Sequence, residues 1–333
     1  MKKYYFLFIA LTAMIYTSCS KLVDPTPETP DPLKEINLTD TLSMYAGNVI
    51  NINYTITPAS YDTTKLVWAS SDTSIIAVTN SGKISAKKVG ISTISVSNLA
   101  KTVSVSCAVT VKDSLSVGLL AYYPFNSSAA DFTGHGYNGT TNNVTLVANR
   151  FGVANSAYYF DGLTSFIEVA DKPELRLNNT DFTLNTWVKL EDYNTSFGSA
   201  ILLKRISDVN NGWNLSVRGY GGSPEGRVSF GQGGGSVMGF SNTIIGLSNW
   251  TMISCVYKLS DQKLKIYVNG LLDKTVDNLS TPNAFVTSSL YIGKDEPSIL
   301  SNGYFFKGII DDIRIYNRKL NENEITKLYN LTY

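Results

Sequence analysis

The sequence is short of the residues on which catalysis and nucleic-acid binding depend. It contains a single histidine, His135, so a Ser-His-Asp or Cys-His arrangement would have to be built around one residue in a glycine-flanked loop. Its 28 basic and 27 acidic side chains nearly cancel and form no long run of one sign, so we expect no nucleic-acid partner. Charged residues make up only 17%, whereas Ser, Thr, Asn, Gly and Tyr are plentiful, which is typical of an all-β protein outside the cytoplasm.

The apolar run at residues 4–16 is too short to cross a bilayer, which needs about 20 apolar residues. It follows two lysines and ends in small residues, so residues 1–18 have the pattern of a signal peptide. Thr17-Ser18-Cys19 resembles the lipobox of bacterial lipoproteins, although Tyr16 stands where that motif usually has an aliphatic residue. The resemblance implies lipidation of Cys19 and a membrane partner through that anchor. An ordinary secretory signal with an incidental cysteine is the alternative.

A proline-rich linker is expected at residues 19–35. Its four prolines and scattered acidic residues predict an extended, solvated spacer that lifts the folded part off the membrane. We therefore predict a lipid-anchored protein of the bacterial cell envelope, placed in the outer membrane. Lys21-Leu22-Val23 lacks the acidic cluster that some surface-exported lipoproteins carry, so periplasmic and surface display both stay open.

Residues 36–113 predict a small β-sandwich, because apolar and polar residues alternate between turn signals. In order along the chain, Val67-Trp68-Ala69-Ser70-Ser71-Asp72, Gly82-Lys83-Ile84-Ser85-Ala86 and Gly90-Ile91-Ser92-Thr93-Ile94 resemble the group 2 bacterial Ig-like domain. The resemblance implies a spacer or adhesive module in which Trp68 is a core residue. A junction to the next domain is expected at residues 113–118.

Residues 119–333 predict a second domain with longer strands and denser aromatic residues. Strands are expected at residues 182–188, 250–257, 263–268 and 308–316. Asn269-Gly270 is a hairpin-turn signal. Tyr159-Phe160-Asp161-Gly162, Ile266-Tyr267-Val268-Asn269-Gly270 and Leu290-Tyr291-Ile292-Gly293 resemble, in this order, the laminin-G-like, concanavalin A-like jelly-roll family. The resemblance implies a jelly-roll β-sandwich but no single function, because this fold carries lectins, adhesins and hydrolases alike.

The chain is expected to end in a short helix, since Asn321 and Glu324 form a capping box ahead of an apolar face. The predicted fold class is therefore all-β: a small Ig-like β-sandwich followed by a concanavalin A-like jelly-roll β-sandwich with a short C-terminal helix. Cys107 and Cys255 lie in apolar strands of different domains. We expect two separate buried thiols there rather than a disulfide between the domains.

A glycoside hydrolase is the one enzyme class that we weigh. Sandwich glycosidases place acidic residues at alternating positions of one strand, so that two carboxylates share a face. Glu168, Asp171 and Glu174 are three residues apart with a proline among them, which does not place all three on one strand face. Asp311 and Asp312 are adjacent and should point to opposite faces. We therefore predict a protein that is not an enzyme.

A structural calcium site is the expected cofactor. Ca²⁺ takes six to eight oxygen ligands, and Asp131 and Asn138 lie in one tight, glycine-rich loop. This loop resembles the segment that in the same family wraps a calcium ion together with an Asp of the last strand, which Asp311 matches. We predict Asp131, Asn138 and Asp311 as the ligands. The alternative is a metal-free turn in which Asp311 accepts hydrogen bonds from loop amides, because an inward carboxylate needs a metal or several donors.

Aromatic side chains in loops are the candidates for stacking on sugar rings. Trp187, Trp213 and Trp250 occupy strand positions and are expected in the core, while the glycine-rich residues 219–235 predict a hairpin and no phosphate loop. The candidates for ligand binding are Tyr193, Tyr220, Phe240 and Tyr304.

The lipobox and the domain order resemble those of Bacteroidetes-type surface lipoproteins that capture polysaccharides. We therefore predict a non-catalytic, lipid-anchored envelope protein that binds a polysaccharide or host glycan through its jelly-roll domain. Two alternatives stay open: an adhesive or structural module that binds another protein, and a divergent glycoside hydrolase.

Overall fold

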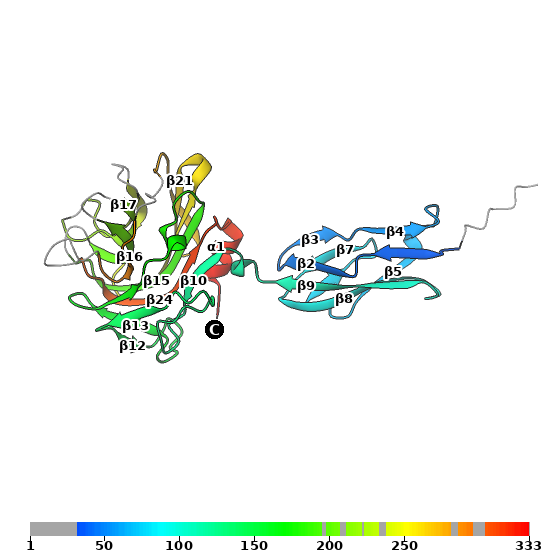
Figure 1. Cartoon of the computed structure of the whole chain (residues 1–333), viewed down its shortest axis with the longest axis horizontal. Coiled ribbons are helices and arrows are strands. Elements are labelled where there is room, and N and C mark those ends of the chain that lie inside the picture. Colours follow the sequence, from blue (N-terminus) through cyan, green and yellow to red (C-terminus); the bar gives the residue numbers. More distant parts are fainter. Residues whose placement is uncertain are drawn as a thin grey trace, which may run out of the picture. The chain divides into compact units, whose positions relative to one another are not determined.

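The computed structural model describes residues 32–194, 198–206, 211–221, 223–232, 238–280, 286–295 and 304–332. The regular elements among these residues are mostly strands, and the helix α1 (Glu322–Tyr329) lies near the C-terminus (Figure 1). The chain divides into two compact units, Met1–Lys112 and Asp113–Tyr333. The all-β fold class is confirmed, whereas Cys19 and the predicted signal peptide lie outside the described residues. Across the described ranges, no helix is long and apolar enough to cross a membrane.

Three small sheets make up the first unit, with the strand orders β1-β4, β2-β9-β8-β5 and β3-β7-β6. The strands are β1 (Glu35–Leu38), β2 (Thr41–Tyr45), β3 (Val49–Asn51), β4 (Tyr54–Thr57), β5 (Leu66–Ser70), β6 (Ile76–Val78), β7 (Lys83–Ala86), β8 (Gly90–Asn98) and β9 (Ser104–Lys112). Strands β2 and β9 pair in parallel, and β8 pairs antiparallel with both β9 and β5. The likeness of this unit to an Ig-like domain stays a prediction.

Trp68 is a core residue of the first unit, as predicted. It is buried together with Ile94 and Cys107. Its ring lies against the turn at Gly82, where an added Cβ would come within 2.8 Å of the ring carbon Cζ2. The backbone of Gly82 also has a φ of +77°, which side chains disfavour. Glycine is therefore required at this turn by its conformation and by the close approach of the tryptophan.

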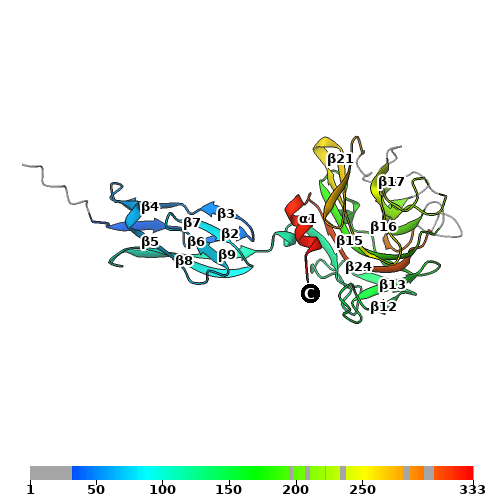
Figure 2. The ribbon, with the colours of Figure 1, turned by 180° about the vertical axis from the view of Figure 1, so that it is seen from behind.

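The second unit is a sandwich of two sheets (Figure 2). One has eight strands, in the order β12-β13-β24-β15-β20-β21-β22 with β10 paired to β24, and the other has the seven-strand order β11-β14-β23-β16-β17-β18-β19. Their inner faces share one apolar core. The strands are β10 (Leu119–Tyr123), β11 (Gly139–Asn142), β12 (Thr145–Val147), β13 (Ala157–Asp161), β14 (Phe166–Val169), β15 (Phe182–Asp192), β16 (Ser199–Ile206), β17 (Asn211–Val217), β18 (Arg227–Gln232), β19 (Met238–Ile244), β20 (Trp250–Lys258), β21 (Lys263–Val268), β22 (Leu271–Val276), β23 (Leu290–Ile292) and β24 (Lys307–Tyr316).

Helix α1 packs on the outer face of the eight-stranded sheet. The predicted capping box is confirmed, because the Asn321 side chain accepts from the Glu324 amide while the Glu324 carboxylate accepts from the Asn321 amide. Ile325 and Leu328 are buried in a cluster with residues of β15, β20 and β21. The helix thus shields an apolar patch of the sheet from water.

Both described cysteines are buried free thiols, as predicted. Cys107 belongs to the core of the first unit and Cys255 to that of the second. Burial raises the pKa of both thiols, so they stay protonated and pack as small apolar side chains.

The prediction that Asp311 and Asp312 point to opposite faces is wrong. Both carboxylates bind the guanidinium of Arg150, at 2.8 Å for Asp311 and 3.0 Å for Asp312. The reason is a β-bulge: the register between β15 and β24 shifts beside these residues, and Asp312 has a left-handed backbone with a φ of +50°. The strict alternation of a strand fails there, and the two side chains converge.

Candidate functional site

A shallow groove crosses the strands on the outer face of the seven-stranded sheet. Backbone pairing aligns Phe240 of β19 with Ser229 of β18. Ser229 is paired with Ser216 of β17, which is paired with Ala200 of β16. The Ala200 amide donates to the carbonyl of Tyr304 at 3.0 Å. Directly paired side chains on one face lie about 4.5–5.5 Å apart, so this row is continuous, with small side chains between two aromatic residues. We call it the cross-strand groove.

A second row runs beside the first. It pairs Met238 with Gly231, Gly231 with Asn214, Asn214 with Leu203 and Leu203 with Tyr291. Gly231 has no side chain to fill the floor, and a Cβ placed there would meet the amide of Asn214 at 3.4 Å. The floor of the groove therefore combines small, hydroxyl and amide side chains.

Strand alternation explains why these residues face outward. In β17 the side chains of Trp213, Leu215 and Val217 are buried in the core of the sandwich. Asn214 and Ser216 lie between them in the sequence, so they project from the opposite face and are half-buried. The apolar residues that hold the sheet in the sandwich thus fix the direction of the polar groups that line the groove.

Ser229 is the most unusual residue of the floor. It is fully buried, and its hydroxyl has no hydrogen-bond partner within the described residues. A buried hydroxyl without a partner costs about 1–3 kcal/mol. Ser229 also lines a cavity of the groove, so a ligand group would supply the missing bond once the side chains over this hydroxyl move apart.

Charged side chains stand beside this floor. Arg205 donates through Nε to one carboxylate oxygen of Asp295 at 3.0 Å and through a terminal nitrogen to the other. Such a two-point contact fixes both side chains. Arg205, Arg218 and Tyr304 line a cavity of about 40 Å³, and a second cavity of about 410 Å³ shares Met238 and continues to β22. The polar floor is therefore a small part of a longer surface depression.

Two of the four predicted aromatic residues do not lie in exposed loops. Phe240 is a half-buried residue of β19, and its ring centroid lies 6.0 Å from the guanidinium carbon of Arg218. Tyr304 is 9% exposed and packs against Ala200 and Leu203. Burial, together with the Asp295 carboxylate, raises the pKa of Tyr304. Both rings flank the groove instead of standing free above it.

Tyr193 and Tyr220 do come together, as an edge-to-face pair with ring centroids 5.6 Å apart. The hydroxyl of Tyr193 donates to the carbonyl of Ile245 at 2.7 Å, which ties this half-buried ring down. Tyr220 is 51% exposed and follows Arg218 by two residues. Of the four candidates, Tyr220 is the one that offers an open face for stacking.

The structure brings Asp131 and Asn138 together, since the Asn138 side chain accepts from the Asp131 amide at 2.9 Å. Asp311 is held by Arg150, and no group of three metal-binding His, Cys, Asp or Glu side chains occurs in the described part of the chain. Both carboxylate oxygens of Asp131 already accept hydrogen bonds from the Tyr122, Thr133 and Tyr137 amides and the Thr133 hydroxyl. These donors occupy the space around the carboxylate in which a cation would have to bind, so the geometry does not fit calcium well. The calcium site stays a prediction.

The converging carboxylates of Asp311 and Asp312 are poorly placed for hydrolysis. Both carboxylates are buried. The guanidinium of Arg150, whose side chain is 4% exposed, binds both of them and offsets their negative charge. The side chains of Asp311 and Asp312 are 0% and 2% exposed, so they present almost no surface to a substrate. Asp171 is held in the same way by Arg176 at 2.5 Å and by Lys204 at 2.6 Å.

Comparison with protein families matches residues 160–326, half of the chain, to the Concanavalin A-like lectin/glucanases superfamily. The chain belongs to this superfamily, and the jelly-roll sandwich expected for the second domain is confirmed. A search of curated proteins gave no match.

Solved structures share the fold. The binding domain of Paraclostridial Mosquitocidal Protein 1 is 18% identical, with a TM-score of 0.52 over 65% of this chain and 52% of that one. The binding domain of botulinum neurotoxin serotype D/C is 14% identical, with a TM-score of 0.51 over 65% and 53%. Domain 4 of AbnA, a GH43 extracellular arabinanase from Geobacillus stearothermophilus, solved with arabinotriose, is 23% identical, with a TM-score of 0.49 over 63% and 98%. This chain spans about half of each toxin domain, and at 18% and 14% identity the likeness to these two domains shows the fold alone.

Proposed function

We propose that the protein is a non-catalytic carbohydrate-binding protein of the bacterial envelope, anchored through a lipid on Cys19, with the cross-strand groove as its glycan site. The observation that carries the proposal is the floor of the groove, where the unpartnered Ser229 hydroxyl lies beside Ser216 and Asn214 and between the rings of Phe240 and Tyr304. Sugars present hydroxyls at their edges and apolar C–H groups on their faces. A polar floor with aromatic flanks matches both.

Asp295 is the one carboxylate among the described residues that line the smaller cavity of the groove, and its ion pair supports a binding role. Asp295 is held by Arg205 in a two-point contact. A retaining or inverting glycosidase needs two carboxyl groups on either side of the scissile bond. Selectivity would then come from the hydroxyl and amide groups of the floor, while anchoring through Cys19 would hold the captured polysaccharide at the cell.

The test is a binding screen of the full-length protein against polysaccharides and host-type glycans, followed by titration of the best ligand. We expect Phe240→Ala and Tyr220→Ala each to weaken binding by about tenfold, equal to about 1.4 kcal/mol. Phe132→Ala is the matched control, because Phe132 is an exposed aromatic residue of the same unit outside the groove. Binding that all three variants retain, or release of reducing sugar by the wild type, would contradict the proposal.

A further inference from the structure

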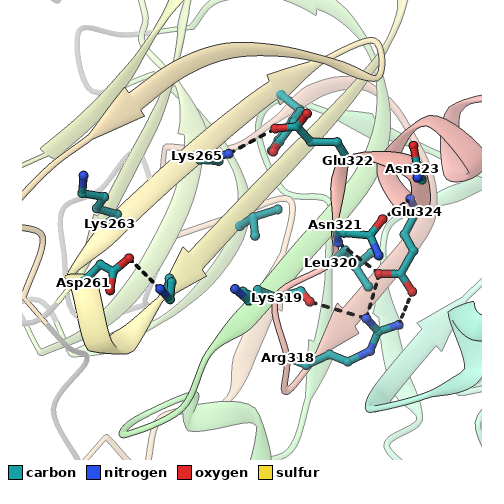
Figure 3. A pocket seen from close by; sticks show the side chains of 13 residues that line it. Asp261, Lys263, Lys265, Arg318, Lys319, Leu320, Asn321, Glu322, Asn323 and Glu324 are labelled. Atoms are coloured by element: carbon teal, nitrogen blue, oxygen red, sulfur yellow. Dashed lines mark hydrogen bonds and ion pairs between the residues drawn. The ribbon is translucent and has the colours of Figure 1, made fainter.

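A large cavity lies on the other sheet. It measures about 740 Å³ and is bounded on one side by β20 and β21 and on the other by residues 318–324, which lead into α1 (Figure 3). Its lining residues Val256 and Tyr267 belong to the cluster under α1, whereas the neighbouring Cys255 and Ile266 belong to the core of the sandwich. The cavity therefore opens on the outer face of the eight-stranded sheet and shares no lining residue with the cross-strand groove.

The floor of this pocket is apolar and its sides are charged. Val256, Tyr267 and Leu320 are almost fully buried. Around them the pocket contains five cationic and three anionic side chains: Lys258, Lys263, Lys265, Arg318, Lys319, Asp261, Glu322 and Glu324. We call this site the lysine pocket. Its lining has a positive balance of two charges in a chain whose total charge is nearly zero.

Arg318 and Glu324 are committed to the fold. The guanidinium of Arg318 donates to both carboxylate oxygens of Glu324 and to the carbonyls of Val117 and Ser114. Glu324 also completes the capping box with Asn321. This pair is neutral and saturated, so a ligand would meet the four lysines and the two remaining carboxylates.

Three of the four lysines form exposed ion pairs, and that of Lys263 is with Asp277 at 3.1 Å. Lys258 contacts Asp261 at 2.7 Å, and Lys265 contacts Glu322 at 3.1 Å, with all four side chains at least 39% exposed. Exposed pairs of this kind contribute little to stability, so an anionic ligand can displace them at little cost. Lys319 is exposed and forms no ion pair with any described residue. Figure 3 shows it across the pocket from Lys263 and Lys265.

We propose that the lysine pocket binds an acidic oligosaccharide, a sugar chain that carries carboxylate or sulfate groups. The volume of the pocket falls within the range of about 300–1,000 Å³ that is typical of small-molecule sites. This volume exceeds what a single inorganic anion needs. Lysines on both sides suit negative charges repeated along a chain, because an ammonium group makes strong charge-assisted hydrogen bonds with such anions. The apolar floor suits the C–H faces of the rings between these charges.

The site is independent of the groove proposed above, and the two can succeed or fail separately. With the cross-strand groove on one outer face and the lysine pocket on the other, the protein could bind a neutral and an acidic stretch of the same polysaccharide. Simultaneous engagement of two sites raises the overall affinity without any new contact, provided that the ligand can reach both.

The experiment measures binding of three hexasaccharides to the full-length protein: a sulfated heparin fragment, an oligogalacturonate that carries only carboxylates, and a neutral maltohexaose. We expect at least one acidic ligand to bind, maltohexaose not to compete at this site, and binding to weaken as salt is raised. The double variant Lys265→Gln/Lys319→Gln should lose about tenfold in affinity, equal to about 1.4 kcal/mol. The sulfated and carboxylated arms identify which anion the pocket prefers.

The matched control is Lys87→Gln/Lys88→Gln, which removes the same charge from exposed positions of the first unit. An equal loss of affinity in both double variants would show attraction to overall charge only and would overturn the proposal. Absence of binding to both acidic ligands, or tighter binding of an acidic peptide such as polyglutamate, would also overturn it. Phe240→Ala should leave this binding unchanged, which separates a failure of the lysine pocket from a failure of the groove.

Discussion

The two outer faces of the second unit differ in what lies on them. The eight-stranded sheet is covered by α1, and it contains Arg150 between the buried carboxylates of Asp311 and Asp312. The seven-stranded sheet instead presents a row of small polar residues from Phe240 to Tyr304. Both sheets contribute to one core, so the core does not explain this difference. The first face therefore combines a covering helix and buried ion pairs with the lysine pocket, whereas the second presents the cross-strand groove.

Replacing one arginine on each face should give the largest difference in stability between the two faces. Arg150→Met removes the ion-pair partner of the buried Asp311 carboxylate and one of two arginine partners of Asp312, which keeps Arg314 at 3.1 Å. Breaking a buried ion pair in this way costs about 3–5 kcal/mol. Arg205→Met removes the partner of Asp295, but the Arg205 side chain is 22% exposed and the loss should be smaller. Urea denaturation of both full-length variants measures the free energy of unfolding. Equal losses would contradict the contrast between the faces.

The same ion cluster should make the stability of the second unit depend on pH. Burial and the neighbouring Asp312 carboxylate raise the pKa of Asp311 to about 7 from its ordinary 3.8, against the opposing effect of Arg150. Between pH 3.8 and about 7, the Asp311 carboxyl group keeps its proton in the folded state but has lost it in the unfolded chain. The contribution of Asp311 to stability is therefore present at low pH and is lost as pH rises through about 7.

Melting temperatures of the wild type and Asp311→Asn, measured across this range, test that sign. Asparagine cannot ionise, so the variant should lose the part of the pH dependence that lies between the two pKa values. A wild type that becomes more stable over the same interval, with a slope that the Asp311→Asn substitution abolishes, would show that the carboxylate is ionised in the fold.

A smaller effect is expected where α1 begins. Asn321→Ala removes the side chain that accepts from the Glu324 amide, and loss of such a cap costs about 1 kcal/mol. Asn323→Ala is the control, because Asn323 is exposed and lies within the first turn of the helix. If both variants melt at the temperature of the wild type, the helix that covers this face depends on its apolar contacts alone.

Features set by neighbouring residues were predictable from the sequence. Asn269 and Gly270 both have positive φ values, of +50° and +80°, as a tight hairpin turn requires. The capping box of α1 likewise depends on two residues three positions apart. The burial of Cys255 was expected from its place in an apolar strand, and that of Trp68 was implied by the resemblance of its segment to an Ig-like domain. In each case the physical cause acts over a few residues.

Features set by distant partners were not predictable. The bulge at Asp312 depends on β15 and on Arg150, which lies 162 residues earlier in the chain. The cross-strand groove is assembled from β16, β17, β18 and β19, and its register follows from the packing of the whole sheet. Phe240 was expected in a loop, yet it belongs to strand β19. The lysine pocket similarly joins β21 to the start of α1.

The most direct test of the central claim is a crystal structure of the protein with the tightest saccharide from the screen. The account predicts a sugar ring over the floor of the cross-strand groove, with a hydroxyl within hydrogen-bond distance of Ser229 Oγ and a C–H face against Phe240. A saccharide bound only elsewhere on the second unit, or cleaved in the crystal, would contradict it.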